Sequence, residues 1–357
     1  SCALLDADGR LVVNAPHIPV HLGALGLCVR EVSKGRKWKE GDTVMVNHPA
    51  FGGSHLPDVT LISPVFVGVR LIGFVANRAH HAEIGGKAPG SMPAEARCLE
   101  EEGVVVAPTL LCESGKSRLQ EVEDLFLAAR YPSRMLSDNL ADLAAQSASN
   151  HYGVRALQDL ARGSSCEIVL RNMAELRRHA TEVMSSKLRP LDGRQWQGED
   201  ILDDGTPIRV FLRCSGKGLE VDFAGSGPVH DGNLNATEAI VRSAVLYVLR
   251  AWAGDDLPLN EGLLDNVHIK IPDGILCPPF PTDPSVCPAV VGGNVETSQR
   301  VVDVLLDALD LQANSQGTMN NFLFGNAAFA YYETIGGGSG AGPGWSGLSG
   351  THVHMSN

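Results

Sequence analysis

The sequence predicts an α+β protein with a strand-rich N-terminal part, a helical middle and a mixed C-terminal part. Short apolar runs bounded by Gly and Pro fill the first part, which is typical of buried strands. Apolar residues then recur at helical spacing, and both patterns occur in the last part. Because 357 residues are enough for more than one core, we expect a multi-domain chain with regions 1–115, 116–190 and 191–357.

The first predicted elements are a hairpin turn and three strands. Gly9 is free to take the positive φ that such a turn requires. The turn is expected over Asp6–Gly9, and the strands over Thr43–Val46, Val59–Ile62 and Leu71–Val75.

Three helices are predicted in the middle region, where apolar residues return every three or four positions. Their ranges are Glu121–Ala129, Asn139–Ala161 and Cys166–Leu188. Pro190 ends the last helix, because proline interrupts helical hydrogen bonding.

The C-terminal region begins with a predicted hairpin, Ile208–Leu212 and Leu219–Phe223, followed by helices over Ala236–Trp252 and Glu296–Leu311. The glycine cluster in 336–357 is too dense for regular structure. A group of aromatic residues before it is expected to lie in a core rather than to form a stacking platform: Phe322, Phe324, Phe329, Tyr331 and Tyr332.

Composition excludes several classes of partner. The formal charge is −12, from 29 basic and 41 acidic residues, so no basic surface is available for nucleic acid. No apolar run reaches the length of a membrane span. The 8 cysteines are scattered, which favours reduced thiols in the cytoplasm over a zinc ribbon or a disulfide framework. The chain begins without Met and ends beside a glycine-rich loop, so we expect a piece truncated at both ends.

The histidine distribution is the sharpest chemical signal, since six of the 12 His lie in the first 81 residues. His55 and Asp58 precede one predicted strand, and His80 and His81 follow a neighbouring one. A ligand pair from a strand start and a ligand from a strand end can meet at one point. Imidazole and carboxylate groups suit a divalent ion such as Mn, Zn or Fe.

Within this cluster we predict His55, Asp58 and His80 as metal ligands. His81 is expected to support them from the opposite face, because adjacent strand residues point in opposite directions. His17 and His21 are further candidates on an extended segment, since Pro19 argues against a helix there. For any single histidine, ordinary packing is the alternative interpretation.

Two glycine-rich loops have backbone N–H groups that suit an anion or oxyanion: Gly85 with Gly86, and Gly337 with Gly338 inside the cluster Gly336–Gly342. A purely structural turn is the alternative for each loop. Neither loop matches a Walker A motif or a dinucleotide fingerprint, so this chain is not expected to bind ATP itself. Ser54 lacks the surroundings of a serine-hydrolase nucleophile.

Nine blocks that together cover essentially the whole chain share a family pattern: Ser1–Arg10, Ala15–Gly23, Gly52–Asp58, Asn77–Gly86, Pro89–Pro93, Asp142–Gln146, Val221–Gly225, Gly293–Arg300 and Tyr332–Gly342. Taken together, these blocks resemble the hydantoinase B family, which includes the C-terminal half of 5-oxoprolinase and a subunit of acetone-carboxylase-type enzymes. Two positions depart from the family pattern: His48 stands where the family usually has Asp, and Glu83 also replaces Asp.

The resemblance implies an ATP-dependent cyclic amidohydrolase that works as a hetero-oligomer. A hydantoinase A-type partner would bind ATP and phosphorylate a small cyclic amide of the hydantoin or 5-oxoproline class. The metal-binding positions of the carboxylase branch, which hold manganese, match His55, Asp58 and His80.

The expected mechanism is hydrolysis at the metal, which would lower the pKa of a water molecule and polarise the activated amide. His81 or Glu83 would act as general base, and a glycine loop would stabilise the oxyanion. Two alternatives remain open: an ATP-dependent ketone carboxylase subunit of the acetone carboxylase type, and a non-catalytic scaffold subunit.

Overall fold

The computed structural model describes residues 1–15, 18–254, 257, 259–316, 321–326 and 329–356. Helices and strands are both abundant and most strand pairs are antiparallel, so the predicted α+β class is confirmed. Among the described residues, no helix combines the length and apolar character needed to cross a membrane.

A seven-stranded antiparallel sheet forms the N-terminal half, in the order β2-β1-β5-β4-β3-β6-β7. Its strands are β1 (Cys2–Leu5), β2 (Leu11–Asn14), β3 (Thr43–Val46), β4 (Asp58–Val67), β5 (Arg70–His80), β6 (Thr109–Glu113) and β7 (Lys116–Ser117). The predicted strand Thr43–Val46 is confirmed to the residue. The strands predicted at Val59–Ile62 and Leu71–Val75 lie in the first halves of β4 and β5.

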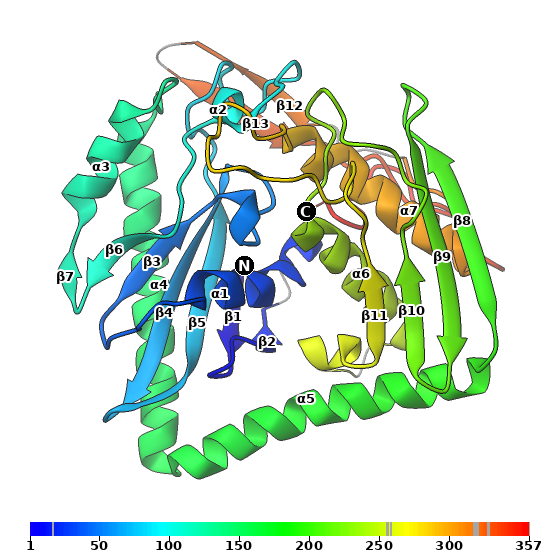
Figure 1. The fold of residues 1–357 in the computed structure, drawn as a ribbon, viewed down its shortest axis with the longest axis horizontal. Coiled ribbons are helices and arrows are strands. Elements are labelled where there is room, and N and C mark those ends of the chain that lie inside the picture. The colour runs from blue at the N-terminus through cyan, green and yellow to red at the C-terminus, as the bar shows by residue number, and fades with distance from the viewer. Residues whose placement is uncertain (16–17, 255–256, 258, 317–320, 327–328, 357) are drawn as a thin grey trace.

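Helices cover both faces of this sheet (Figure 1). Helix α1 (Ala24–Ser33) packs on one face against Phe74 and Ile62. Helix α4 (Leu136–Gly163) packs on the other face, where Leu157 meets Ile72. The short helix α2 (Leu99–Glu102) and helix α3 (Leu119–Ala128) enclose a further part of the core.

The second half is built on a four-stranded sheet in the order β11-β10-β9-β8. Its strands are β8 (Gln195–Ile201), β9 (Pro207–Ser215), β10 (Gly218–Asp222) and β11 (Val267–Lys270). Helices α6 (Glu238–Ala253) and α7 (Ser298–Ala308) pack against it in one apolar core. A separate hairpin, β12 (Asn321–Gly325) with β13 (Ala330–Thr334), lies at the top in Figure 1.

Helix α5 (Cys166–Leu188) joins the two halves and runs along the lower edge in Figure 1. Val169 and Met173, near its start, pack in the core beneath the first sheet. Ala180 and Met184, near its end, pack in the core of the second half. The predicted range of this helix is confirmed. The division into regions 1–115, 116–190 and 191–357 stays a prediction, and the apolar cores extend across its boundaries.

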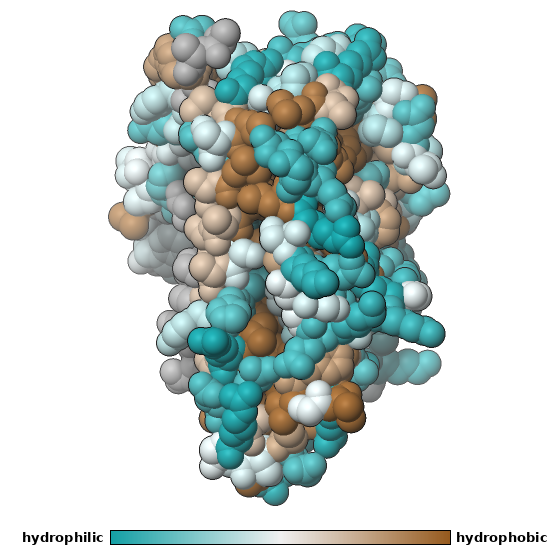
Figure 2. All heavy atoms as spheres, turned by 90° about the vertical axis from the view of Figure 1, so that its left-hand side faces the viewer, coloured by the Kyte–Doolittle hydropathy of each residue, from teal (hydrophilic) through white to brown (hydrophobic). Residues whose placement is uncertain are grey.

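The outer face beside α3 and β7 carries both hydrophobic and hydrophilic side chains. Figure 2 shows hydrophobic residues gathered in the upper part of this face and hydrophilic residues running down its middle. Phe126 of α3 is fully buried, whereas Leu127 beside it is 54% exposed. Phe126 and Leu127 therefore differ in burial although they are adjacent residues of the same helix.

We expect Phe126→Ala to lower the free energy of unfolding by about 3 kcal/mol or more, because it removes a ring from a packed core and leaves a cavity. Chemical denaturation followed by circular dichroism measures this change. Leu127→Ala on the same helix is the matched control and should have a small effect. Equal losses in the two variants would contradict the expectation that burial of the Phe126 ring causes the loss.

Candidate metal centre

The β4–β5 ladder brings two predicted ligands together. Asp58, the first residue of β4, is the direct antiparallel partner of His80, the last residue of β5. His55 lies in the turn before β4, where its carbonyl accepts a hydrogen bond from the Asp58 amide at 3.1 Å. Neighbouring strands and one tight turn therefore place the three side chains at one end of the sheet.

The three side chains are close enough to share one ion. His55 Nε2 lies 3.2 Å from Asp58 Oδ2, and His80 Nδ1 lies 3.3 Å from Asp58 Oδ1. One ligand atom from each residue lies within 4.8 Å of the others. His55 and Asp58 are buried, and the His80 side chain is 20% exposed. The described residues thus contain the predicted trio as a compact cluster.

Both imidazoles keep a nitrogen without a partner. His55 Nδ1 and His80 Nε2 are buried and make no hydrogen bond within the described part of the chain. The nitrogens that face the Asp58 carboxylate are the other two, His55 Nε2 and His80 Nδ1, so each ring has one nitrogen on the carboxylate and one left unpaired, which is unusual for buried polar atoms. The donor set fits a divalent cation, which binds through such lone pairs.

The charge states also suit a cation. Burial alone would raise the pKa of Asp58, but the adjacent His55 and His21 hold it well below its usual range. Burial lowers the pKa of His55 and lowers that of His21 to about 4. At neutral pH the carboxylate is therefore ionised and these imidazoles are neutral, as metal binding requires.

Two further side chains hold the carboxylate in place. The Ser54 hydroxyl donates to Asp58 Oδ2 at 2.5 Å, and His21 Nε2 lies 3.0 Å from the same oxygen. His21 was a candidate ligand, and the structure places it against Asp58 Oδ2. The other candidate of that pair, His17, lies outside the described residues. Ser54 supports Asp58, a role that its position beside His55 did not reveal.

His81 lies on the opposite side of the strand from His80. Its ring is fully buried against α4, with Nε2 3.0 Å from Gln146 Oε1 and Nδ1 3.1 Å from Asn139 Nδ2. This placement agrees with the alternation of strand side chains. A small cavity opens at His55, Asp58 and His80, the ligand trio, and His81 does not line it.

Glu83 organises a loop rather than facing the trio. Its carboxylate accepts hydrogen bonds from the amides of Gly85 at 2.6 Å and Gly90 at 2.9 Å, and it pairs with Arg134 at 3.0 Å. Its side chain is almost fully buried. It too is absent from the lining of the cavity.

The four glycines predicted to stabilise an oxyanion have backbone groups that bond within the chain. The Gly85 amide donates to Glu83, and the Gly86 amide donates to the Tyr131 carbonyl at 3.1 Å. The Gly337 carbonyl accepts from the Gly350 amide, and Gly338 pairs with Ser349 in an isolated bridge. None of the four glycines lines the cavity at His55, Asp58 and His80.

His48, one of the departures from the family pattern, has a local role. Its Nδ1 accepts a hydrogen bond from the Ala50 amide at 3.1 Å and caps the 3-10 turn Pro49–Phe51. The ring packs edge-on against Phe51 and Phe280. His48 is therefore part of the scaffold behind the site.

A cavity of about 130 Å³ opens at the ligand trio. It is lined by residues from both halves of the chain: Ile18, Val20, His21, His55, Asp58, His80, Asn294, Tyr332, Thr334 and Met355. Asn294 comes from the π-helical turn Gly293–Thr297 before α7, and Tyr332 from β13 stacks near His80 with ring centroids 4.8 Å apart. Sequence reasoning missed Asn294, although it lies in a block that carried the family resemblance.

The prediction that the late aromatic residues form a core was wrong. Strand alternation turns only Tyr332 toward the cavity, while the exposed fractions of Phe322, Phe324, Phe329 and Tyr331 are 41–52%. These four rings contact one another on the outer side of the β12–β13 hairpin. Aromatic density in the sequence was therefore an unreliable sign of burial here.

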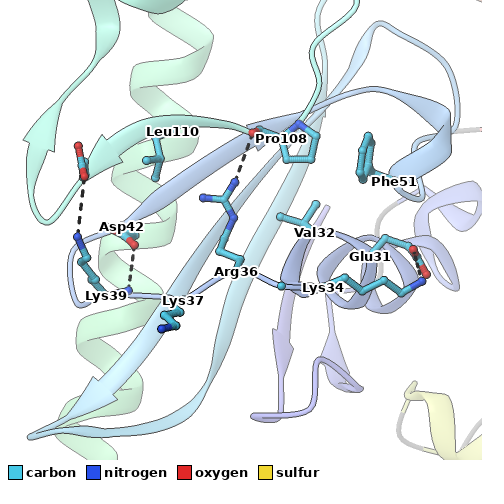
Figure 3. A pocket seen from close by; sticks show the side chains of 12 residues that line it. Glu31, Val32, Lys34, Arg36, Lys37, Lys39, Asp42, Phe51, Pro108 and Leu110 are labelled. Atoms are coloured by element: carbon cyan, nitrogen blue, oxygen red, sulfur yellow. Dashed lines mark hydrogen bonds and ion pairs between the residues drawn. The ribbon is translucent and has the colours of Figure 1, made fainter. Parts of the chain in front are cut away.

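A larger pocket of about 500 Å³ lies between the end of α1 and β6 and contains none of the predicted ligands (Figure 3). Two ion pairs join charged side chains of its wall. Lys34 bonds to Glu31 at 2.6 Å, and Lys39 lies 4.0 Å from Glu113. Among the described residues, the one cluster of possible metal ligands lies at the smaller cavity, which is therefore the stronger candidate.

Glu102 fixes the turn that presents Asn294. It is completely buried, and its Oε1 accepts hydrogen bonds from the amides of Val290 at 2.9 Å and Val291 at 2.8 Å. Its Oε2 has no partner in the described structure. Burial raises the pKa of Glu102 from 4.5 to about 8, so the carboxyl is protonated at neutral pH.

Comparisons with known proteins cover the whole chain. A family profile described as Hydantoinase B/oxoprolinase matches residues 1–357. 5-Oxoprolinase 1 of Arabidopsis thaliana is 42% identical over 386 residues, an alignment that covers 100% of this chain and 30% of the plant protein. A putative D-/L-hydantoinase subunit of a Pseudomonas species is 28% identical, over 86% of this chain and 54% of the Pseudomonas protein.

Two solved structures have similar folds. The ATP-dependent caprolactamase from Pseudomonas jessenii has a TM-score of 0.86 and 25% identity, covering 99% of this chain and 63% of the caprolactamase chain. Nucleotide-free acetone carboxylase has a TM-score of 0.83 and 16% identity, covering 99% of this chain and 51% of its own. At that lower identity the second likeness concerns the fold alone.

We expect Glu102→Gln to stabilise the protein increasingly as pH rises from 5 to 8. The folded chain keeps the Glu102 proton up to about pH 8, whereas the unfolded chain loses it near 4.5, so the wild-type protein loses stability across this window. Glutamine keeps the acceptor and does not titrate, so the gain should reach about 4 kcal/mol at pH 8. Denaturant unfolding at several pH values measures it.

The matched control is Glu101→Gln, because the neighbouring Glu101 carboxylate is near the surface and bonds to Lys87. That variant should show no gain with rising pH. A flat difference between Glu102→Gln and the wild-type protein across this range would mean that Glu102 is ionised in the folded chain.

Proposed function

The chain belongs to the hydantoinase B/oxoprolinase family, and from that premise we propose that it takes part in ATP-dependent hydrolytic ring opening of a cyclic amide of the hydantoin or 5-oxoproline class. A hydantoinase A-type partner supplies the ATP-dependent phosphorylation in this proposal. Support comes from the Pseudomonas relative, whose name makes it one subunit of a hydantoinase and so suggests assembly with another. A second relative in fold is an ATP-dependent caprolactamase, which acts on a cyclic amide.

The observation that carries the proposal is the cluster of His55, Asp58 and His80 with its unpartnered imidazole nitrogens. These residues would hold a divalent ion, Mn, Zn or Fe. Such an ion supplies Lewis acidity, which lowers the pKa of water and polarises a carbonyl-type electrophile.

The chain's own residues supply preorganisation. Ser54 and His21 fix the Asp58 carboxylate, so the ligand oxygens do not reorient during the reaction. Ile18 and Met355 form apolar walls of the small cavity and limit access of bulk water. A positioned ring amide in this cavity would lie directly against the ligand trio.

The general-base role of His81 or Glu83 stays a prediction. The hydrogen bonds of His81 to α4 and of Glu83 to the Gly85–Gly90 loop favour a positioning role for both residues. We likewise keep the oxyanion role of the glycine loops as a prediction, since the amides of Gly85 and Gly86 already donate to partners within the chain. The free state of all eight cysteines supports a cytoplasmic setting, where thiols stay reduced.

A metal analysis is the first test. We expect about one divalent ion per chain, since one cluster of three ligands is present among the described residues. His55→Ala and His80→Ala should each lose most of it, because each removes one of three protein ligands. His230→Ala is the matched control, since His230 pairs with Asp204 in an exposed His–Asp contact outside the cavity.

Elemental analysis of purified, folded protein gives the readout. An ion retained in both cavity variants would place the metal elsewhere. Metal-free protein that keeps full activity in the complex would favour the scaffold alternative.

An activity assay separates ring opening from ketone carboxylation. The full-length chain with its ATP-binding partner should open hydantoin, 5-oxoproline or caprolactam in an ATP-dependent reaction, and Asp58→Asn should reduce the rate at least about a hundredfold by weakening the metal site. Ketone with bicarbonate is the competing substrate. Carboxylation without amide hydrolysis would replace the proposal by the carboxylase alternative.

A further inference from the structure

Asn294 has an unused hydrogen-bonding group inside the metal cavity. Its side chain is 5% exposed and lines the cavity with the ligand trio. Asn294 Oδ1 is buried and has no partner in the described structure. Its Nδ2 makes one long contact, at 3.4 Å, with His55 Nε2. The carboxamide therefore presents a free acceptor and a spare N–H where a substrate would bind.

The turn that carries Asn294 is held rigidly. Glu102 accepts hydrogen bonds from the two amides before Gly292, and the Gly293 amide donates to the Asn233 carbonyl at 2.9 Å. A Cβ atom added to Gly293 would lie 1.9 Å from the Asn235 carbonyl oxygen, so only glycine allows this close approach. The Ser298 hydroxyl donates to the Asn294 carbonyl at 2.7 Å. The backbone that carries the side chain is thus fixed before a ligand binds.

The hydroxyl groups that line the cavity already have hydrogen-bond partners within the chain. The hydroxyls of Tyr332 and Thr334 both donate to Asn321 Oδ1, at 3.1 and 2.9 Å. Ile18, Val20 and Met355 add apolar surface that suits ring methylenes. Apart from the ligand trio, Asn294 is therefore the described lining residue with a buried acceptor left open.

The chemistry of a carboxamide matches one edge of a small ring amide. In a small ring the amide is cis, so its C=O and N–H lie side by side and point the same way. The Asn side chain presents the complementary pair, an acceptor beside a donor. A buried acceptor without a partner is costly, and a ligand N–H would relieve that cost.

We propose that Asn294 recognises the cis amide edge of the ring substrate in its unphosphorylated form, accepting the ring N–H and donating to the ring carbonyl. The site then selects cyclic amides with a free ring N–H and rejects their N-alkylated forms. This inference rests on the proposed function, because it takes the substrate to be a cyclic amide. It assigns Asn294 as a substrate-specificity residue that reads the amide, separate from the residues that hold the ion.

The test measures binding of 2-pyrrolidone and N-methyl-2-pyrrolidone to the full-length, metal-loaded chain by NMR titration. The wild-type protein should bind 2-pyrrolidone about tenfold more tightly, since one hydrogen bond is lost and one acceptor is left unpaired with the methylated ring. Asn294→Leu keeps the side-chain volume and should abolish the preference, and Asn294→Ala is a second variant should the first fail to fold.

Glu296→Gln is the matched control, because Glu296 lies on the same turn, pairs with Arg300 and does not line the cavity. It should keep the wild-type preference. The inference is overturned by equal binding of the two lactams to the wild-type chain, by no binding of either, or by an Asn294→Leu variant that weakens both alike. Ring opening by the complete complex is scored separately: a wild-type chain that prefers 2-pyrrolidone in a complex that opens no cyclic amide would sink the proposed function alone.

Discussion

The register between β4 and β5 is the constraint on which the candidate site depends. Asp58 and His80 face the same cavity because they are direct partners in the ladder, and a shift of one residue would turn one of them to the other face. Buried amides of α4 secure that register from behind. Gln146 donates to the Val59 carbonyl and to Asn77 Oδ1, so it bonds to both strands at once. A polar contact inside the core thereby fixes where the ligands lie.

The same site depends on assembly of the two halves. The first sheet supplies the ligand trio, while Asn294, Tyr332 and Met355 come from the C-terminal half and close the cavity. Glu102 makes the connection direct, because a side chain from α2 accepts hydrogen bonds from the start of the helix that leads to Asn294. Helix α5 belongs to both apolar cores. A complete cavity therefore requires both cores to be folded, and its shape depends on how the two halves are placed relative to each other.

Local patterns predicted much of the framework and the meeting of the three ligands. Helix Cys166–Leu188 followed from its apolar spacing, and the ligand trio followed from one hairpin whose ends are close in sequence. Asn294 was out of reach because its approach to His55 depends on packing between distant elements. The prediction that the aromatic residues lie in a core was wrong because the β12–β13 hairpin has one face toward the cavity and the other face exposed. Phe324 and Tyr331 lie on the exposed face. Burial there is decided by tertiary contacts, which the pattern alone does not contain.

The positions of the buried polar atoms without hydrogen-bond partners support the proposal that the small cavity binds a cation and a ring amide. Three of the buried atoms without partners, His55 Nδ1, His80 Nε2 and Asn294 Oδ1, belong to residues that line one small cavity. Each such atom costs about 1–3 kcal/mol unless something pairs with it. Glu102 avoids the cost of a buried charge by keeping its proton, whereas the imidazole nitrogens and the amide oxygen need an external partner. Ligands that supply a cation and an N–H donor would return that energy on binding, so binding and folding stability are linked at this site.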